Sequence, residues 1–231
     1  DATYLYLLLT QPSITEYISN IADTAVSSYP SINPSDIASI EFKFPSYGIQ
    51  KLVANIWSAF DRKIELNRAI NQNLEAMAKQ LYDYWFVQFD FPNEEGKPYK
   101  SSGGTMVWNE KLKREIPKGW NNGTLIDIAN ITMGQSPDGT SYNEIGEGVL
   151  FYQGSTDFGM RFPSVRQYTT APSRFAKKGD ILMSVRAPVG AVNIANKDCC
   201  IGRGLSALNS KIGSITHLYY CLLYTSDAAD E

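Results

Sequence analysis

Apolar side chains recur every three or four residues between residues 48 and 86, a stretch without proline whose single glycine is Gly48. This spacing is that of one face of an α-helix, and because it persists through four heptads it is also that of a coiled-coil seam. The positions are Val53, Ile56, Phe60, Lys63, Asn67, Ile70, Leu74, Met77 and Leu81. A helix of this length extends roughly 50 Å. The pattern therefore predicts a spacer helix over residues 48–88.

Two explanations of this helix are open. It either packs on its own domain, or it forms half of an antiparallel coiled coil, and its length favours the second. The polar residues Lys63 and Asn67 then fix register and partner choice at some cost in stability. The partner is expected from sequence outside this chain or from self-association. The expected interface comprises Val53, Ile56, Phe60, Asn67, Ile70, Leu74, Met77 and Leu81.

The segment that precedes the helix, residues 1–47, has the pattern of the end of a domain. Residues 1–25 are predicted to be helical, because apolar positions such as Ile14, Ile18 and Ile21 share one face. Ser35 is predicted to cap a short helical turn after Pro34. The alternation in "IEFKF", residues 40–44, predicts a strand.

After the helix, the polar, Gly/Ser/Pro-containing residues 89–116 predict a connector. A second, incomplete domain is expected over 117–220, with Trp120 packed at its entrance. The apolar runs there predict strands at 124–132, 148–153, 180–186, 190–195 and 204–208. The fold class is therefore α+β: a mixed, β-rich domain joined to a long coiled-coil helix. Residues 221–231, "CLLYTSDAADE", resemble translated sequencing adapter and are expected to be a non-native tail.

Composition excludes several classes of function. The 231 residues carry three cysteines without a C-x-x-C motif and a single histidine, His217, which argues against disulfide frameworks, zinc sites and a Ser-His-Asp triad. No run of 18 apolar residues exists, so no membrane span or membrane partner is expected. The sequence lacks a phosphate-binding loop, an "NPPY"-like methyltransferase tetrapeptide and a glycine-rich cofactor loop. No catalytic residue is therefore predicted.

Charge is unevenly distributed in the second domain, although the whole chain has a net charge of only -3. Residues 121–160 contain five acids and no Lys or Arg, whereas residues 161–211 contain nine Lys or Arg against two Asp, a formal charge of +7. Basic residues interleaved with aromatics can hold phosphates while a few groups contact base edges. The alternative is a solvated basic face that balances an acidic one.

Two arginines stand at predicted turns between apolar runs. Arg186 precedes Ala-Pro in "ILMSVRAPVG", and Arg203 lies between two glycines in "CIGRGLSAL". An arginine in either place can contact guanine through two hydrogen bonds or hold a phosphate.

Together, these features resemble the specificity subunit of type I DNA restriction-modification systems. The resemblance covers nearly all of residues 1–220. It rests on "INPSDIASIEFKFPS", the long helix, "IPKGW", and then "KGDILMSVRAPVGAVNIA" with "CIGRGLSAL". It implies two target recognition domains held apart by two antiparallel helices, each domain recognising half of a split DNA sequence. This chain would contain the end of the first domain, one helix and most of the second domain.

The resemblance further implies that the chain is not itself an enzyme and binds no cofactor. Methyltransferase and restriction/translocase subunits would supply S-adenosylmethionine, ATP and Mg²⁺ chemistry, in the cytoplasm of a prokaryote. The expected partners are double-stranded DNA and those subunits. The expected DNA contacts are Arg186, Arg203, Gln153, Ser155, Ser136, Arg161, Lys177 and Lys178.

The roles of these residues are open at this point. Because "RAPVG" recurs in family members that recognise different sequences, Arg186 is favoured as a structural or phosphate contact over a base contact. Gln153 either hydrogen-bonds adenine or caps a turn, and Arg161, Lys177 and Lys178 either hold phosphates or are ordinary surface charges. Two rival functions also stay open: a coiled-coil protein-interaction module without DNA binding, and a recognition domain fused to a methyltransferase.

Overall fold

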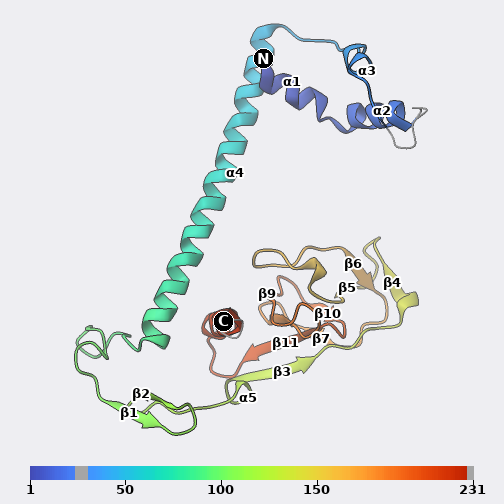
Figure 1. Ribbon diagram of the computed structural model, residues 1–231. Helices are drawn as coiled ribbons and strands as arrows, with labels where there is room; N and C mark the ends of the chain where they lie inside the picture. The colour runs from blue at the N-terminus through green and yellow to red at the C-terminus, as the bar shows by residue number, and fades with distance from the viewer. Residues whose placement is uncertain (24–30, 228–231) are drawn as a thin grey trace. The chain divides into compact units, whose positions relative to one another are not determined.

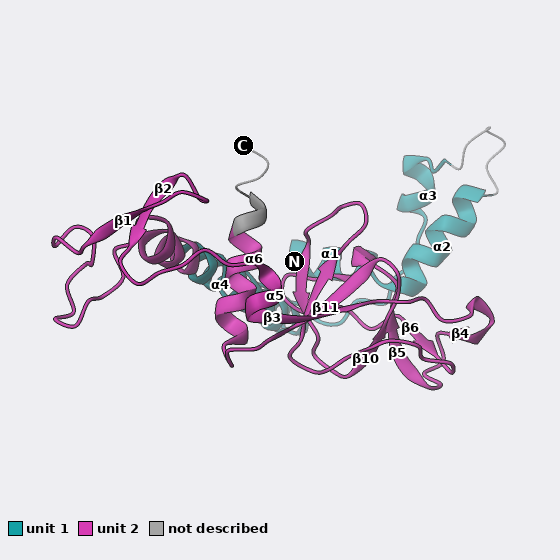
Figure 2. Cartoon of the chain, turned by 90° about the horizontal axis from the view of Figure 1, so that it is seen from below, with its two compact units in different colours: residues 1–76 teal, residues 77–231 magenta. Residues whose placement is uncertain are grey.

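The computed structural model describes residues 1–23 and 31–227 (Figure 1). The chain forms two compact units, Asp1–Ala76 and Met77–Glu231 (Figure 2). The described part of the first unit contains helices joined by loops and no strand, and the second unit contains every described strand. This mixture of a long helix and several small sheets confirms the predicted α+β class.

The first unit begins with two helices, α1 (Ala2–Leu9) and α2 (Pro12–Asp23). The Asp1 carboxylate caps α1 by accepting a hydrogen bond from the Tyr4 N–H at 3.1 Å. The helical prediction for residues 1–25 is therefore confirmed over these two ranges, and positions 24 and 25 lie outside the described residues.

Two local predictions in this unit are wrong. The short helix α3 (Pro34–Ala38) is capped by Asn33 rather than Ser35, because Pro34 is already the first helical residue and Asp36 hydrogen-bonds back to the Asn33 N–H at 2.9 Å. Residues 40–44 form no strand. Alternating apolar residues do not by themselves make a strand. A strand also needs a neighbouring strand for its backbone hydrogen bonds, and none within the described residues provides them here.

The long helix, α4 (Tyr47–Tyr82), has 36 residues, and a π-helical turn, η1 (Asp83–Val87), follows it directly. The predicted helix over 48–88 is thus confirmed to within a few residues. Ala54 is the single buried residue of α4. The apolar seam is uncovered within the described residues: Phe60 is 62% exposed and Met77 63% exposed. An apolar stripe of this length is typical of an interface rather than of a solvated face.

The second unit contains three sheets (Figure 1). A hairpin joins β1 (Met106–Asn109) to β2 (Arg114–Pro117). The other strands form a five-stranded sheet in the order β4-β6-β5-β10-β7 and a four-stranded sheet in the order β3-β11-β8-β9. Every pair is antiparallel except β5 with β10. The bounds are β3 (Ala129–Met133), β4 (Tyr142–Asn143), β5 (Val149–Tyr152), β6 (Gln167–Thr169), β7 (Phe175–Ala176), β8 (Ile181–Ser184), β9 (Val192–Ile194), β10 (Cys199–Ile201) and β11 (Leu205–Ser210).

Four of the five predicted strands correspond to β5, β8, β9 and β11. The fifth, over 124–132, is wrong in its first half, where the helical turn α5 (Leu125–Ile128) precedes β3. The Thr124 and Asp127 side chains cap this turn, with the Asp127 carboxylate 2.7 Å from the Thr124 N–H. Thr-Leu-Ile-Asp is a capping-box sequence, and this local signal prevails over the apolar run.

The last helix, α6 (Ile215–Asp227), completes the core on the four-stranded sheet. Its Leu218 and Tyr219 are buried in one cluster with Ile181 of β8 and Leu208 of β11. The helix continues through residues 221–227, which the sequence assigned to a non-native tail, and the Tyr224 ring lies 5.4 Å from that of Tyr82. The expectation about the origin of this tail is untested.

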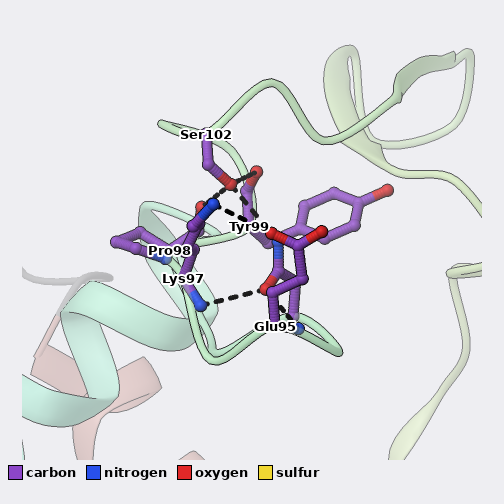
Figure 3. Close-up of polar contacts among 6 residues, drawn as sticks. Glu95, Lys97, Pro98, Tyr99 and Ser102 are labelled. Carbon is purple, nitrogen blue, oxygen red and sulfur yellow. Dashed lines mark hydrogen bonds and ion pairs between the residues drawn. The ribbon is translucent and has the colours of Figure 1, made fainter.

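The predicted connector, residues 89–116, holds a loop, strand β1 and all of β2 but its last residue. Figure 3 shows part of the loop, where the Ser102 hydroxyl donates to the Pro98 carbonyl at 2.6 Å and the Lys97 ammonium lies 2.9 Å from the Glu95 carboxylate. Trp120 stacks on Phe91 with the rings 5.2 Å apart and meets Phe89 edge-on. Trp120 therefore packs against the loop that precedes it, and the domain boundary predicted at residue 117 stays a prediction.

Replacing Leu218 by alanine is expected to lower the free energy of unfolding by about 2–5 kcal/mol, the usual cost of a cavity at a buried leucine. Leu218 is 2% exposed and joins α6 to the sheet. Urea unfolding monitored by circular dichroism measures the change. Ile212→Ala is the control: that side chain is 62% exposed, so a change below about 0.5 kcal/mol is expected. Equal small losses in both variants would show that α6 does not belong to the core.

A second expectation concerns acid stability. The hydroxyl and backbone N–H of Ser101 donate to the Asp90 carboxylate and lower its pKa from the usual value of 3.8. A lowered folded pKa contributes stability that is complete above the unfolded value and is lost as pH falls through the folded one. Asp90→Asn is therefore expected to reduce the fall in melting temperature between about pH 5 and about pH 2.5. An unchanged fall would mean that this carboxylate does not contribute.

Candidate nucleic-acid interface

The turn that carries Arg203 lies directly on the backbone after β5. The Gly202 N–H donates to the Tyr152 carbonyl at 2.8 Å, and the Gly204 N–H donates to the Gln153 carbonyl at 3.1 Å. A Cβ atom at Gly202 would lie 2.9 Å from the Gln153 Cα, and one at Gly204 would lie 2.7 Å from the Gln153 carbonyl oxygen. Only glycine fits such an approach. The turn therefore buries its two glycines and leaves Arg203 exposed.

A third segment, residues 134–136, joins this turn after β3. The Gly134 N–H donates to the Leu205 carbonyl at 2.9 Å, and the Gln135 N–H donates to the Ile201 carbonyl at 3.0 Å. A Cβ atom at Gly134 would lie 2.2 Å from the Gly202 carbonyl oxygen, so this position is also restricted to glycine. Three chain segments thus meet backbone to backbone at one end of the two larger sheets. We call this meeting point the glycine junction; it comprises residues 134–136, 153–154 and 202–204.

Ser136 connects the side chains at the glycine junction. Its hydroxyl oxygen accepts from the Gln153 amide at 2.9 Å and from the Arg203 backbone N–H at 3.1 Å. The Arg203 Nε–H is 3.4 Å from the same oxygen. The hydroxyl can also donate to Gln153 Oε1, at 3.1 Å. Three of the predicted DNA-contact residues are therefore one hydrogen-bonded group.

Arg186 lies on the β8–β9 turn beside the glycine junction. The Val185 N–H donates to the Gly204 carbonyl at 2.9 Å, which holds the start of this turn next to Arg203. Ser184 closes the turn: its hydroxyl donates to the Arg186 carbonyl at 2.7 Å, and its carbonyl accepts from the Gly190 N–H at 2.9 Å. The apex, residues 186–189, is exposed and includes a cis Ala187–Pro188 peptide. Two exposed arginines thus project from adjoining turns.

The remaining predicted residues divide between two places. Ser155 begins the short helix η3 (Ser155–Asp157), two residues after Gln153, and so adjoins the glycine junction. Lys177 and Lys178 precede β8, whereas Arg186 follows it, so they belong to the opposite end of the strand. The Lys177 ammonium pairs with Asp198 at 3.2 Å, and the Lys178 N–H donates to the same carboxylate at 2.8 Å. These contacts lower the Asp198 pKa.

Arg161 is also distant from the junction along the sheet. Its carbonyl accepts from the Ile194 N–H, beside the start of β8. Its Nη2 donates to the Tyr220 hydroxyl at 2.9 Å, and its guanidinium lies over the Tyr219 and Tyr220 rings. The side chain therefore packs on α6, which is the structural alternative to a phosphate contact.

Arg174 was not among the DNA contacts predicted from the sequence. Its carbonyl accepts from the Ile201 N–H at 2.9 Å, which holds it beside the last residue of β10, and its side chain is exposed. Ser173 donates to the Gln135 carbonyl and ties the same segment to residues 134–136. The charge count included Arg174, but only the pairing of β7 with β10 brings it near Arg203.

The acidic residues near this region include one that is neutralised inside the fold. Asp157 is buried and accepts from the Arg166 Nε at 2.7 Å and from its Nη2 at 3.4 Å. One of the nine basic residues of 161–211 thus compensates an internal charge.

Among the described residues, no group of three or more His, Cys, Asp or Glu side chains could hold a metal ion. None of the described helices combines the length and apolarity that a membrane span requires.

The chain matches the family model described as the type I restriction modification DNA specificity domain over residues 1–76 and 117–229. It is 37% identical over 226 residues to a protein of Methanocaldococcus jannaschii assigned as the MjaX type I restriction enzyme specificity subunit, covering 94% of this chain and 49% of that protein. The MjaIX type I restriction enzyme specificity subunit of the same organism is 29% identical over 238 residues, with coverages of 95% and 51%. The chain thus spans about half the length of these relatives.

The fold has a match among solved structures. The S subunit of a type I restriction-modification system from M. genitalium superposes with a TM-score of 0.55 at 22% identity, covering 99% of this chain and 54% of that one. The two ranges matched by the family model contain the seam of α4 as far as residue 76 and the whole glycine junction. The chain belongs to the family of type I restriction-modification DNA specificity domains.

Proposed function

We propose that the second unit binds double-stranded DNA through the end of its sheets that carries Arg186, Arg203 and Arg174, and that it recognises one half of a bipartite target. The observation that carries this proposal is the glycine junction. It brings Arg203 beside Arg186, two arginines 17 positions apart in the sequence, on adjoining braced turns. Arginines with exposed guanidinium groups can bind phosphates and base edges.

The two ends of the sheets have different roles in this proposal. Arg186, Arg203 and Arg174 hold the DNA at the junction end. Lys177 and Lys178 are proposed as outer phosphate contacts, although Asp198 already pairs with Lys177. Arg161 is assigned to packing on α6, because its guanidinium is engaged by Tyr219 and Tyr220. Affinity would come mainly from charge and therefore depend steeply on salt.

Catalysis is proposed to belong to other subunits. Methyltransferase and restriction/translocase partners would bring S-adenosylmethionine, ATP and Mg²⁺, and this chain would direct them to the target without binding a cofactor. The exposed seam of α4 would bind a second spacer helix, from sequence outside this chain or from a second copy. The same seam is the one observation that favours the rival function, a coiled-coil interaction module without DNA binding.

Salt-dependent binding to a random duplex pool tests the DNA proposal. The double variant Arg186→Ala/Arg203→Ala lacks both arginines. The plot of log binding constant against log salt concentration is expected to become shallower by up to about 2, and enrichment of a short sequence is expected to disappear. Fluorescence anisotropy of the whole chain measures binding, and sequencing of the bound pool measures enrichment. The control Lys97→Ala/Lys113→Ala removes two exposed charges elsewhere in the unit. Equal losses in both double variants would attribute binding to net charge alone.

Sedimentation velocity tests the role of the seam. The chain is expected to self-associate at micromolar concentration, because the exposed apolar stripe of α4 has no partner within the described residues. Phe60→Glu/Ile70→Glu places two charges on the stripe and is expected to shift the population to monomer. Gln72→Glu, between seam positions on the opposite side of the helix, is the control and should leave association unchanged. A sharp monomer of the unaltered chain would contradict the expectation.

A further inference from the structure

The hydrogen-bonding capacity of Ser136 is taken up inside the protein. A serine hydroxyl has one proton and two lone pairs. The Gln153 amide and the Arg203 backbone N–H donate to the oxygen from 2.9 and 3.1 Å. The Arg203 Nε–H competes with them for the two lone pairs, and Gln153 Oε1 can accept the hydroxyl proton. A phosphate oxygen would have to displace one of these partners. Ser136 is therefore poorly suited to a DNA contact of its own.

The same contacts restrict Arg203. Its backbone is held on Gln153 by the flanking glycines, where added Cβ atoms would lie under 3.0 Å from Gln153 atoms. Its Nε–H is directed at Ser136, which leaves the terminal Nη1 and Nη2 groups without a hydrogen-bond partner among the described residues. These two groups form the donor pair that contacts guanine O6 and N7. Arg203 thus presents its outer donors from a side chain that is fixed at both the backbone and Nε.

Arg186 provides the contrast. Its turn is braced through backbone groups and Ser184, yet its guanidinium makes no hydrogen bond, ion pair or ring contact within the described residues. A guanidinium that no other group of the protein orients suits a phosphate, which can be approached from many directions, whereas discrimination between bases requires a fixed donor geometry. The two arginines therefore differ in what the fold does to their side chains.

We propose that Ser136 is a positioning residue for sequence recognition: it orients the Arg203 guanidinium for a two-hydrogen-bond contact with guanine and does not itself touch DNA. This inference rests on the proposed DNA binding and deepens it by assigning base recognition to Arg203. The Gln153 amide holds Ser136 from the other side, so Gln153 acts in the same group rather than as an independent contact with adenine.

The test uses the whole chain and two probes: the duplex enriched from a random pool and a duplex of scrambled sequence. Ser136→Ala is expected to weaken binding to the enriched duplex about tenfold and binding to the scrambled duplex less than about twofold. Ser136→Thr keeps the hydroxyl and is expected to restore the preference. The control Ser102→Ala removes a hydroxyl that also hydrogen-bonds inside the protein, and it should leave both affinities unchanged.

A double-mutant cycle separates positioning from direct contact. If Ser136 acts through Arg203, Ser136→Ala adds almost nothing to the loss already caused by Arg203→Ala. Arg203→Lys keeps the positive charge but lacks the planar guanidinium with its Nε and Nη donors. It should therefore lose the preference for the enriched duplex while it retains binding to the scrambled duplex. This variant keeps the test decisive even if Ser136→Ala folds poorly.

Three results would overturn the inference. Additive losses in the cycle would mean that Ser136 contacts DNA directly. Equal weakening on both duplexes, with a lowered melting temperature, would mean that Ser136 only supports the fold. Retention of the preference in Arg203→Lys would mean that Arg203 does not recognise a base. Absence of binding to either duplex by the unaltered, folded chain would instead overturn the proposed function, and the inference with it.

Discussion

The backbone contacts at the glycine junction determine how the second unit is assembled. The turn between β10 and β11 passes from the five-stranded to the four-stranded sheet, and at this crossing it lies against both Gly134 and Gln153. There is no room for a Cβ at Gly134, Gly202 or Gly204, so the three segments can approach only as bare backbone. The hydrogen bonds from Gly134, Gly202 and Gly204 then fix the register of the crossing. A larger residue at any of these positions would separate the two sheets.

This constraint also explains why so few side chains serve the candidate interface. Because the junction is built from backbone and glycine, its side chains are only Gln135, Ser136, Gln153 and Arg203, and both Gln153 and Arg203 hydrogen-bond Ser136. The adjoining β8–β9 turn adds Arg186 through the Val185 N–H, and the end of β10 adds Arg174. The charge asymmetry of the sequence becomes a local arginine cluster only through these contacts.

The sequence predicted what depends on local periodicity or on a strong motif. The heptad stripe predicted α4, and the apolar runs predicted β5, β8, β9 and β11. It did not predict β4, β6, β7 and β10, which have two or three residues each and exist because a neighbouring strand accepts their hydrogen bonds. The strand expected at 40–44 does not form, although its residues alternate, because no neighbouring strand within the described residues accepts its hydrogen bonds.

The candidate site shows the same division. Arg186 and Arg203 could be selected from the sequence because each interrupts an apolar run at a turn. The link between Ser136 and Arg203, 67 positions apart, could not, because it depends on the crossing of two sheets. Arg161 and Arg166 looked equivalent to other basic residues in the sequence. In the fold, Arg161 contacts the tyrosines of α6, and Arg166 pairs with the buried Asp157.

The most direct test of the account is site-specific photocrosslinking to duplex DNA. A photoreactive phenylalanine analogue would be placed in turn at position 186, on the turn beside the junction, and at position 212, an exposed turn beyond the far end of β11. We predict crosslinks from position 186 that weaken as salt rises and are several times stronger than those from position 212, at the end of the sheets that carries Lys177 and Lys178. Crosslinks from position 212 alone, or equal crosslinks from both, would contradict the assignment of the arginine-bearing end of the sheets as the DNA-binding face.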